Sequence, residues 1–181
     1  MRPVAPGGKT MNRILIIGIC GSGKSTLARM LHEETGLPLV HLDALYWLPG
    51  WRERPKEEFD ALLMDELAKP RWIIDGNYSR TLPLRLRYCD AVIWLDYNRF
   101  TALWGVVKRV IAHCGRTRPD MGAGCPERFN GSFLKYVWRF NRKNRARFEA
   151  LLAGAEGVDV LRVRSRRALR RALRGGIAFH S

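Results

Sequence analysis

The sequence predicts an α/β protein with one mostly parallel, five-stranded sheet that is covered by helices on both faces. Five short apolar runs alternate with longer segments of helical periodicity along the 181 residues. Several of these runs are continuously apolar, as in strands that are buried on both faces. A glycine-rich loop of the phosphate-binding type directly follows the first run. This alternation is typical of βαβ units in a three-layer α/β fold, and the glycine-rich loop makes the P-loop NTPase type of that fold the expectation.

The expected elements follow one another in a regular order. Strands are expected at residues 13–18, 37–42, 71–75, 91–96 and 158–163. Helices are expected at residues 24–35, after Pro55, at about 80–87, at 98–114 and 132–153, and from Ser165 to the glycines at 175–176. Two segments rich in glycine and proline are expected to be loops, at residues 44–54 and 115–126.

Local signals set several of these boundaries. Gly36 and Pro38 end the first helix, and Pro55 suits the first turn of the next one. The side chain of Ser165 is expected to cap the last helix. The helix at 98–114 carries apolar residues at helical spacing, namely Phe100, Leu103, Trp104, Val107 and Ile111.

The length suits a single domain with one hydrophobic core. We expect a kinase-like domain at residues 12–174 with a lid at about 114–128, between flexible tails at 1–11 and 175–181. No apolar run approaches the roughly 20 residues of a membrane span, and no secretory signal opens the chain. These features predict a cytoplasmic protein without a membrane partner, and they leave the oligomeric state open.

The four cysteines show no close Cys-x-x-Cys pairing, which favours reduced thiols. A zinc site in the lid from His113, Cys114 and Cys125 is an alternative. It offers three ligands where structural zinc sites use four, so the sequence does not favour it.

The net charge of +15 is unevenly distributed. Residues 1–90 carry a net charge of +2, from 13 basic and 11 acidic residues, whereas residues 91–181 carry +13, from 19 and 6. Phosphate-rich substrates, nucleic acid and acidic lipid would all be attracted to the second half. Charge alone does not choose among these partners.

The loop from Gly18 to Ser25 matches the pattern GxxxxGK[ST]. Its glycines let backbone N–H groups point at phosphate oxygens, and the helix that follows adds its dipole. Lys24 is expected to reach the β- and γ-phosphates of ATP, and the Ser25 hydroxyl to bind Mg²⁺. The predicted nucleotide-binding residues are Gly18, Gly21, Ser22, Gly23, Lys24, Ser25 and Thr26.

Three acids follow strands, where ligands of open parallel sheets bind. Asp43 is the first candidate for the acceptor side, as the group that orients or deprotonates a hydroxyl. Asp75 is the first candidate to hold Mg²⁺, through water. Asp96 is the weaker candidate, and helix capping or pairing with an arginine is the favoured interpretation there.

Arginines flank the glycine- and proline-rich loop at 115–126. Arg116 and Arg118, together with Arg109, suit a mobile lid whose guanidinium groups close over transferring phosphates. We assign catalytic roles to Lys24 and Asp43 and to the lid residues Arg116 and Arg118. Two further arginines on the long basic helix, Arg139 and Arg142, could reach the same site.

Four segments together resemble the FlaR-type "DNA topology modulation protein" family, a branch of the adenylate-kinase- and shikimate-kinase-like P-loop kinases. The segments are residues 16–26, 41–51, 72–78 and 115–120, within a resemblance that runs from about residue 12 to 170. The resemblance implies strand order 2-3-1-4-5, binding of ATP and Mg²⁺, and a lid before the long basic helix. It also implies that Asp43 contacts the acceptor and that Asp75-Gly76 lies near magnesium.

Two functions remain open from the sequence. The first is a kinase that transfers the γ-phosphoryl group of ATP to a small molecule or nucleotide. Residues 77–80, Asn-Tyr-Ser-Arg, differ from the Phe-Pro-Arg of adenylate kinases, which weighs against AMP as the acceptor. The second is a nucleotide-dependent regulator that binds DNA through its basic half, as the family name implies. The acids at the strand ends and the arginine-bearing loop favour the kinase.

Overall fold

The computed structural model describes residues 11–174. Residues 1–10 of the expected N-terminal tail at 1–11, and the expected tail at 175–181, lie outside the described residues. Met11, which the sequence analysis placed at the end of the N-terminal tail, is fully buried in the core. The packed part of the chain therefore includes this residue. No helix within residues 11–174 is long and apolar enough to cross a membrane.

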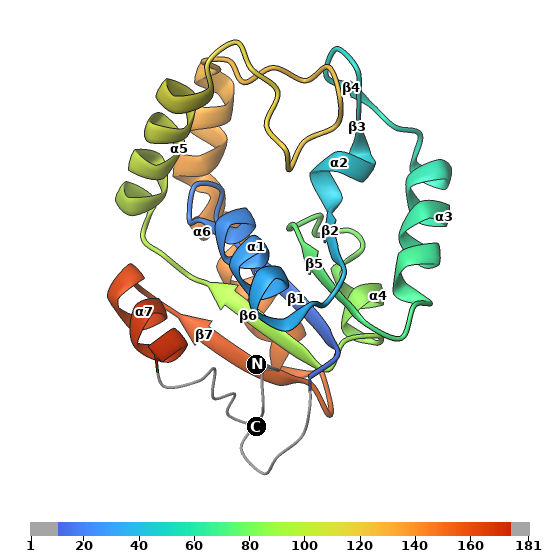
Figure 1. The fold of residues 1–181 in the computed structure, drawn as a ribbon. Coiled ribbons are helices and arrows are strands. Elements are labelled where there is room, and N and C mark those ends of the chain that lie inside the picture. Colours follow the sequence, from blue (N-terminus) through green and yellow to red (C-terminus); the bar gives the residue numbers. More distant parts are fainter. Residues whose placement is uncertain (1–10, 175–181) are drawn as a thin grey trace.

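A five-stranded parallel sheet forms the centre of the molecule (Figure 1). Its strands lie in the order β2-β5-β1-β6-β7, which is 2-3-1-4-5 when only the strands of this sheet are counted. The strands are β1 (Arg13–Gly18), β2 (Leu39–His41), β5 (Trp72–Asp75), β6 (Ala91–Leu95) and β7 (Asp159–Val163). The predicted fold class and strand order are confirmed.

The sheet is covered on both faces by helices. The helices are α1 (Lys24–Thr35), α2 (Leu42–Tyr46), α3 (Lys56–Leu67), α4 (Leu82–Leu86), α5 (Arg99–His113), α6 (Gly131–Ala153) and α7 (Arg166–Arg174). In Figure 1, α1 lies in front of the sheet and α6 passes behind it. The central strands β1, β5 and β6 are buried almost throughout, which explains their continuously apolar sequence.

Residues 44–54 contain more regular secondary structure than the sequence predicted. The second strand ends at His41, and Leu42 begins the short helix α2. A small antiparallel hairpin follows, formed by β3 (Trp47–Leu48) and β4 (Arg52–Glu53). The prediction of a loop at 44–54 and of a strand up to residue 42 was wrong. The apolar Leu42 packs into the core from the start of a helix. In so short an apolar run, periodicity cannot distinguish a helix from a strand.

The helix boundaries agree with the local signals in the sequence. Gly36 ends α1 in a left-handed conformation, and its N–H donates to the His32 carbonyl. Asn98 caps α5, and its side chain accepts a hydrogen bond from the Thr101 N–H. The Ser165 hydroxyl accepts from the Ala168 N–H, as expected for the cap of α7.

The carboxyl edge of the sheet is held together by one buried carboxylate. Asp96, directly after β6, accepts hydrogen bonds from Arg145 of α6 at 3.0 Å and from Arg162 of β7 at 2.6 Å. Its side chain is 1% exposed. These contacts support the interpretation of Asp96 as an arginine partner rather than a residue of the site.

Candidate functional site

A cavity of about 1200 Å³ opens above the carboxyl ends of the central strands. The phosphate-loop pattern and helix α1 lie on one side of it, and α2, the β3–β4 hairpin and α3 on another. The segment between α5 and α6 hangs over it from above (Figure 1). Ligands of open α/β sheets bind in this position.

The phosphate loop folds as its sequence predicts. Gly23 precedes α1 with a φ of +92°, a left-handed conformation that favours glycine. Gly21 has a φ of +81°, and a β-carbon on it would lie 2.2 Å from the Ala102 carbonyl oxygen of α5. Gly105 packs against the same loop, since a β-carbon there would lie 2.0 Å from the Gly21 oxygen. The role of Gly105 in allowing α5 to reach the loop is not apparent from the sequence.

Most of the predicted nucleotide-binding residues meet at the cavity. Gly21, Gly23, Lys24, Ser25 and Thr26 line it. Two predicted members do not reach it. Gly18 lies at the end of β1 and Ser22 is buried.

Asn77 ties the phosphate loop to the segment after β5. Its side-chain oxygen accepts a hydrogen bond from the Gly18 N–H at 2.9 Å. The Nζ of Lys24 donates to the Ile19 carbonyl at 3.4 Å, so the lysine lies against the loop that it is predicted to serve.

Asp43 and Asp75 both line the cavity, although they come from different elements. Asp43 lies in α2, and one of its carboxylate oxygens accepts a hydrogen bond from the Tyr78 hydroxyl at 2.8 Å. Burial raises the pKa of Asp43, the nearby Asp75 raises it further, and the bond from Tyr78 opposes the change. A carboxylate with a raised pKa is better matched to proton transfer near neutral pH.

Asp75 ends β5 and is 5% exposed. Its Oδ2 lies 3.1 Å from the His41 Nδ1, and its Oδ1 is buried without a hydrogen-bond partner. A buried carboxylate oxygen without a partner is costly unless a ligand satisfies it.

Magnesium usually keeps several waters and takes one or two carboxylates together with substrate phosphates. Ser25 and Asp75 on one cavity fit such a site. Within residues 11–174, no three His, Cys, Asp or Glu side chains gather closely enough to hold a metal by themselves. The suggested zinc group of His113, Cys114 and Cys125 is therefore not assembled there.

The segment over the cavity carries a network of ion pairs. The sequence indicated its arginines but not the carboxylates that pair with them. The Arg118 Nε donates to Glu127 at 2.7 Å, and its Nη1 donates to Asp120. Arg109 donates to Glu127 at 3.2 Å. Asp120 and Glu127 are each 5% exposed. These two carboxylates hold Arg109 and Arg118 in fixed orientations at the cavity wall.

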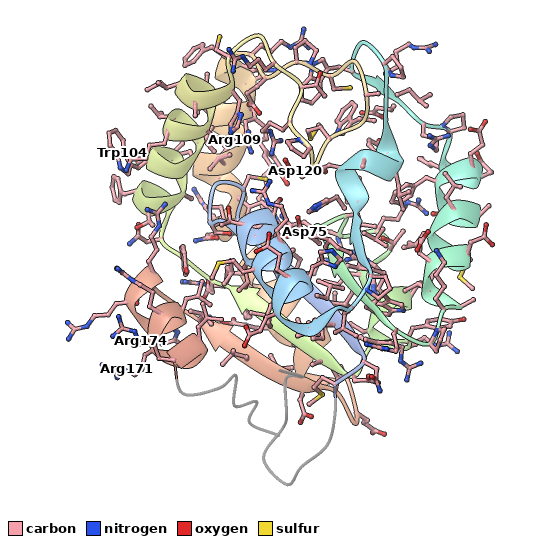
Figure 2. All side chains as sticks on the ribbon, viewed as in Figure 1. Asp75, Trp104, Arg109, Asp120, Arg171 and Arg174 are labelled. Atoms are coloured by element: carbon pink, nitrogen blue, oxygen red, sulfur yellow. The ribbon has the colours of Figure 1, made fainter. Side chains whose placement is uncertain are left out.

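Asp120 also approaches the phosphate loop. Although burial disfavours its charged form, the positive charge of Arg118 and a hydrogen bond from Ser25 lower the pKa of Asp120. Figure 2 shows Asp120 and Arg109 facing the interior above Asp75. Asp120 is the last residue of the segment 115–120, but a single acid in a loop gives no sign that it will fold onto Ser25.

The other predicted arginines lie elsewhere. Arg116 is exposed and does not line the cavity, and neither do the exposed Arg139 and Arg142 of α6. The structure therefore does not bring these three to the site. A role for Arg116 in catalysis stays a prediction.

Carbonyl groups of the segment at residues 120–126 accept hydrogen bonds from the β3–β4 hairpin. The Gly50 N–H donates to the Gly124 carbonyl at 2.9 Å, and the Trp51 indole donates to the Pro126 carbonyl at 3.1 Å. A β-carbon on Gly122 would lie 1.9 Å from the Trp47 carbonyl oxygen, so only glycine permits this approach. The lid and the hairpin together cover the cavity.

A buried arginine shapes the floor of the cavity. Arg85 of α4 is fully buried and donates to the carbonyl oxygens of Gly76, Asn77 and Tyr78. Burial lowers its pKa to about 10. Tyr78 has a φ of +30°, an uncommon conformation for a residue other than glycine. Arg85 therefore stabilises the turn that directs Tyr78 to Asp43, and the sequence analysis did not single it out.

Comparisons with known proteins bear on the fold. No protein-family model matches the chain. The crystal structure of shikimate kinase from Bacteroides thetaiotaomicron matches 92% of this chain and 96% of its own, with a TM-score of 0.53 and 13% identity. Shikimate kinase of Dehalococcoides mccartyi is 50% identical over 36 residues, which is 20% of this chain and 20% of that protein.

These matches define the class of the fold. The chain has a shikimate-kinase-like P-loop fold with a five-stranded parallel sheet. The sequence match spans only about a fifth of the curated relative's length. The finer resemblance to the topology modulation family stays a prediction, and neither match names a function on DNA.

Proposed function

We propose that the protein is an ATP-dependent kinase that phosphorylates a hydroxyl group of a small molecule. The observation that carries this proposal is one cavity shared by Lys24 and Ser25 of the phosphate loop, Asp43 of α2 and Arg118 of the lid. Phosphoryl transfer needs the phosphates, the acceptor and a positive charge in one water-excluding space. The shikimate-kinase-like fold supports the same class of reaction.

Each residue has a distinct part in the proposed reaction. The loop amides and Lys24 bind the ATP phosphates. Ser25 and Asp75 would hold a Mg²⁺ ion, which would offset the negative charge of these phosphates. Asp43, held by Tyr78, accepts the proton of the acceptor hydroxyl. That oxygen then bonds to the γ-phosphorus as the bond to the β–γ bridging oxygen breaks. Arg118 stabilises the charge on the transferring group.

The acceptor end of the cavity favours a cyclic alcohol. Tyr46, Trp47 and Tyr78 line it around Asp43, and Phe59 completes the cluster of rings. The guanidinium at this end, Arg80, is held by the Asp60 carboxylate at 2.6 and 2.8 Å. Aromatic faces suit the apolar face of a ring, and the carboxylate of Asp43 suits its hydroxyl.

A substitution of the loop lysine tests the reaction. We expect Lys24→Ala to abolish ATP turnover, because the group that reaches the β- and γ-phosphates is removed while the fold stays intact. Lys69→Ala is the matched control, since that lysine lies on the surface and pairs with Glu66. Turnover by purified protein would be followed with shikimate, nucleosides and nucleoside monophosphates as acceptors. Retained turnover in Lys24→Ala would refute the proposal.

The alternative of a nucleotide-dependent DNA regulator rests on the net charge of +15 and on the resemblance of the sequence. The salt dependence of DNA binding with and without ATP distinguishes it from charge attraction. A steep, sequence-independent decrease in affinity with salt that ATP leaves unchanged is the behaviour of non-specific attraction.

A further inference from the structure

One flank of the molecule exposes large apolar side chains that no described segment covers. On the outer side of α5, Phe100 is 65% exposed, Trp104 56% and Ile111 76%. Phe129 and Trp138 beside them are 71% and 42% exposed. We call these five residues the aromatic flank. Figure 2 shows Trp104 projecting away from the body of the molecule. Contiguous exposed apolar side chains on this scale indicate an interaction surface.

The flank is built on the face of α5 opposite its packed face. Residues at positions 100, 104, 107 and 111 recur every three or four residues, so they form one stripe about 16 Å long. Ala102 and Val106 on the other side of α5 are buried. Trp138 of α6 extends the stripe, since its ring lies 5.6 Å from that of Phe100. The sequence showed helical spacing here but could not tell that the stripe faces outward.

The charges around the flank are almost all positive. Three Lys or Arg residues lie on α5, six on α6 and five on α7, and Glu149 is the single acid of these three helices. Arg109 and Arg145 pair with Glu127 and Asp96 away from the flank, so they do not add to its charge. Some cations lie directly on the exposed rings, with Arg99 4.3 Å from the Trp138 ring and Lys108 5.2 Å from the Trp104 ring. In Figure 2, Arg171 and Arg174 of α7 project from the same side of the molecule as Trp104.

From this combination we propose that the aromatic flank binds the surface of an anionic lipid bilayer. Helices that lie in the bilayer interface present Trp, Phe and aliphatic residues on one face with Lys and Arg at its border. The aromatic rings and Ile111 enter the headgroup and upper acyl region, while the arginines meet lipid phosphates. The sequence analysis expected no membrane partner because no segment could span a bilayer, but surface binding requires no spanning segment.

Two other occupants fit the flank less well. A second copy of the chain would bring an equally positive surface against this one, and like charges repel. Nucleic acid would suit the arginines and the rings. It gains little from Ile111 or from the aliphatic part of the stripe, because bases stack on flat rings.

Vesicle flotation with the full chain tests the proposal. We expect binding to phosphatidylcholine vesicles that contain phosphatidylglycerol, and at least about tenfold weaker binding to phosphatidylcholine alone. Trp104→Ser combined with Ile111→Ser should lower binding about tenfold or more. Arg171→Glu combined with Arg174→Glu should also weaken it. Met64→Ser, an exposed apolar residue of α3, is the matched control and should bind as the wild type does.

A second measurement, of tryptophan fluorescence, tests the proposal without depending on a variant that loses binding. Acyl chains brominated near the headgroup should quench the tryptophan fluorescence of the wild type, and Trp104→Phe should remove a large part of that quenching. No binding to anionic vesicles would overturn the proposal, as would binding that depends on the arginines but not on Trp104 and Ile111. A dimer in solution that Trp104→Ser dissociates would also overturn it, in favour of a second copy. None of these three results would bear on the kinase proposal, which is judged by ATP turnover.

Discussion

At the scale of single residues, the site depends on carboxylates and on the side chains that bind them. The position of each carboxylate in the sequence does not reveal its partner. Asp43 is held by Tyr78, Asp75 by His41, and Asp120 by Arg118. Asp96 follows a neighbouring strand, yet it serves two arginines and not the cavity. Their roles differ because the partners differ, and those partners come from distant parts of the sequence.

Asp43→Asn should lower turnover on the order of 100-fold or more while ATP affinity stays close to that of the wild type, because the amide cannot accept the acceptor's proton. The same change should raise thermal stability near neutral pH. Burial raises the pKa of Asp43 above its value in the unfolded chain, so the ionised form disfavours the folded state.

The sign of the pH dependence follows from this raised pKa. The folded protein holds the Asp43 proton more tightly, so the wild type loses stability as the pH rises above the unfolded value of about 3.9. The advantage of Asp43→Asn should therefore grow with pH and level off above the folded pKa. Thermal melts of both proteins over a range of pH measure it. An advantage that shrinks with pH, or a loss of ATP affinity, would assign Asp43 a structural or metal-binding role.

At the scale of elements, two short segments position much of the site. The turn after β5 is fixed by Arg85 of α4, and the lid is fixed to the β3–β4 hairpin by Gly122 and Gly124. Both arrangements depend on contacts to backbone carbonyl groups. Every residue has such a group, so the sequence does not show which ones are used. Each can be disturbed by one substitution.

Arg85→Met should destabilise the protein by about 3 kcal/mol, because buried carbonyl oxygens of residues 76–78 lose their donor. Arg85→Lys should restore part of the stability, since an ammonium group can serve some of the same oxygens. Urea unfolding measures both variants. Equal stability of Arg85→Met and the wild type would show that water replaces the guanidinium without cost.

Gly122→Ala should lower kcat/KM on the order of 10- to 100-fold, because its β-carbon would meet the Trp47 carbonyl and keep the lid off the hairpin. Tryptic cleavage in the lid, after Arg116, should become faster. Gly131→Ala is the matched control, since nothing lies within 4 Å of a β-carbon there. If both variants behave alike, the lid does not need its close approach to the hairpin.

At the scale of the whole molecule, the sheet edge and the helices behind it are joined through Asp96. This carboxylate links β6 to Arg145 of α6 and Arg162 of β7, and Arg162 also lies 4.3 Å from the Trp94 ring. Glu149 of α6 also pairs with Arg162 at 2.7 Å, and Phe148 of α6 packs against Trp94. The C-terminal half is therefore attached to the sheet by both charge and packing.

Asp96→Ala should cost about 1.5 to 3 kcal/mol of stability, because Arg145 and Arg162 lose a buried, charged hydrogen-bond acceptor. Asp60→Ala provides the comparison. The pair of Asp60 with Arg80 is exposed on both sides, so its loss should cost less than about 1 kcal/mol. Denaturant unfolding of the two variants measures the difference, and similar costs would contradict a special role for Asp96.

The sequence by itself determined the fold class, the order of the main elements and the phosphate loop. Continuous apolar runs, helical spacing and the pattern from Gly18 to Ser25 are local properties of the chain. Most boundaries therefore fell within a few residues of the observed ones. The error at residues 42–54 arose because a short apolar run suits either a strand or a helix.

Only the tertiary structure decided which side chains meet. Asp120 reaches Ser25, and Arg85 reaches the turn at Tyr78, because the lid and α4 fold back over distant segments. The same packing left Arg116 outside the cavity and turned Phe100 and Trp104 outward. Spacing along a helix shows that residues share a face, but what lies opposite that face depends on long-range packing, which no local pattern contains.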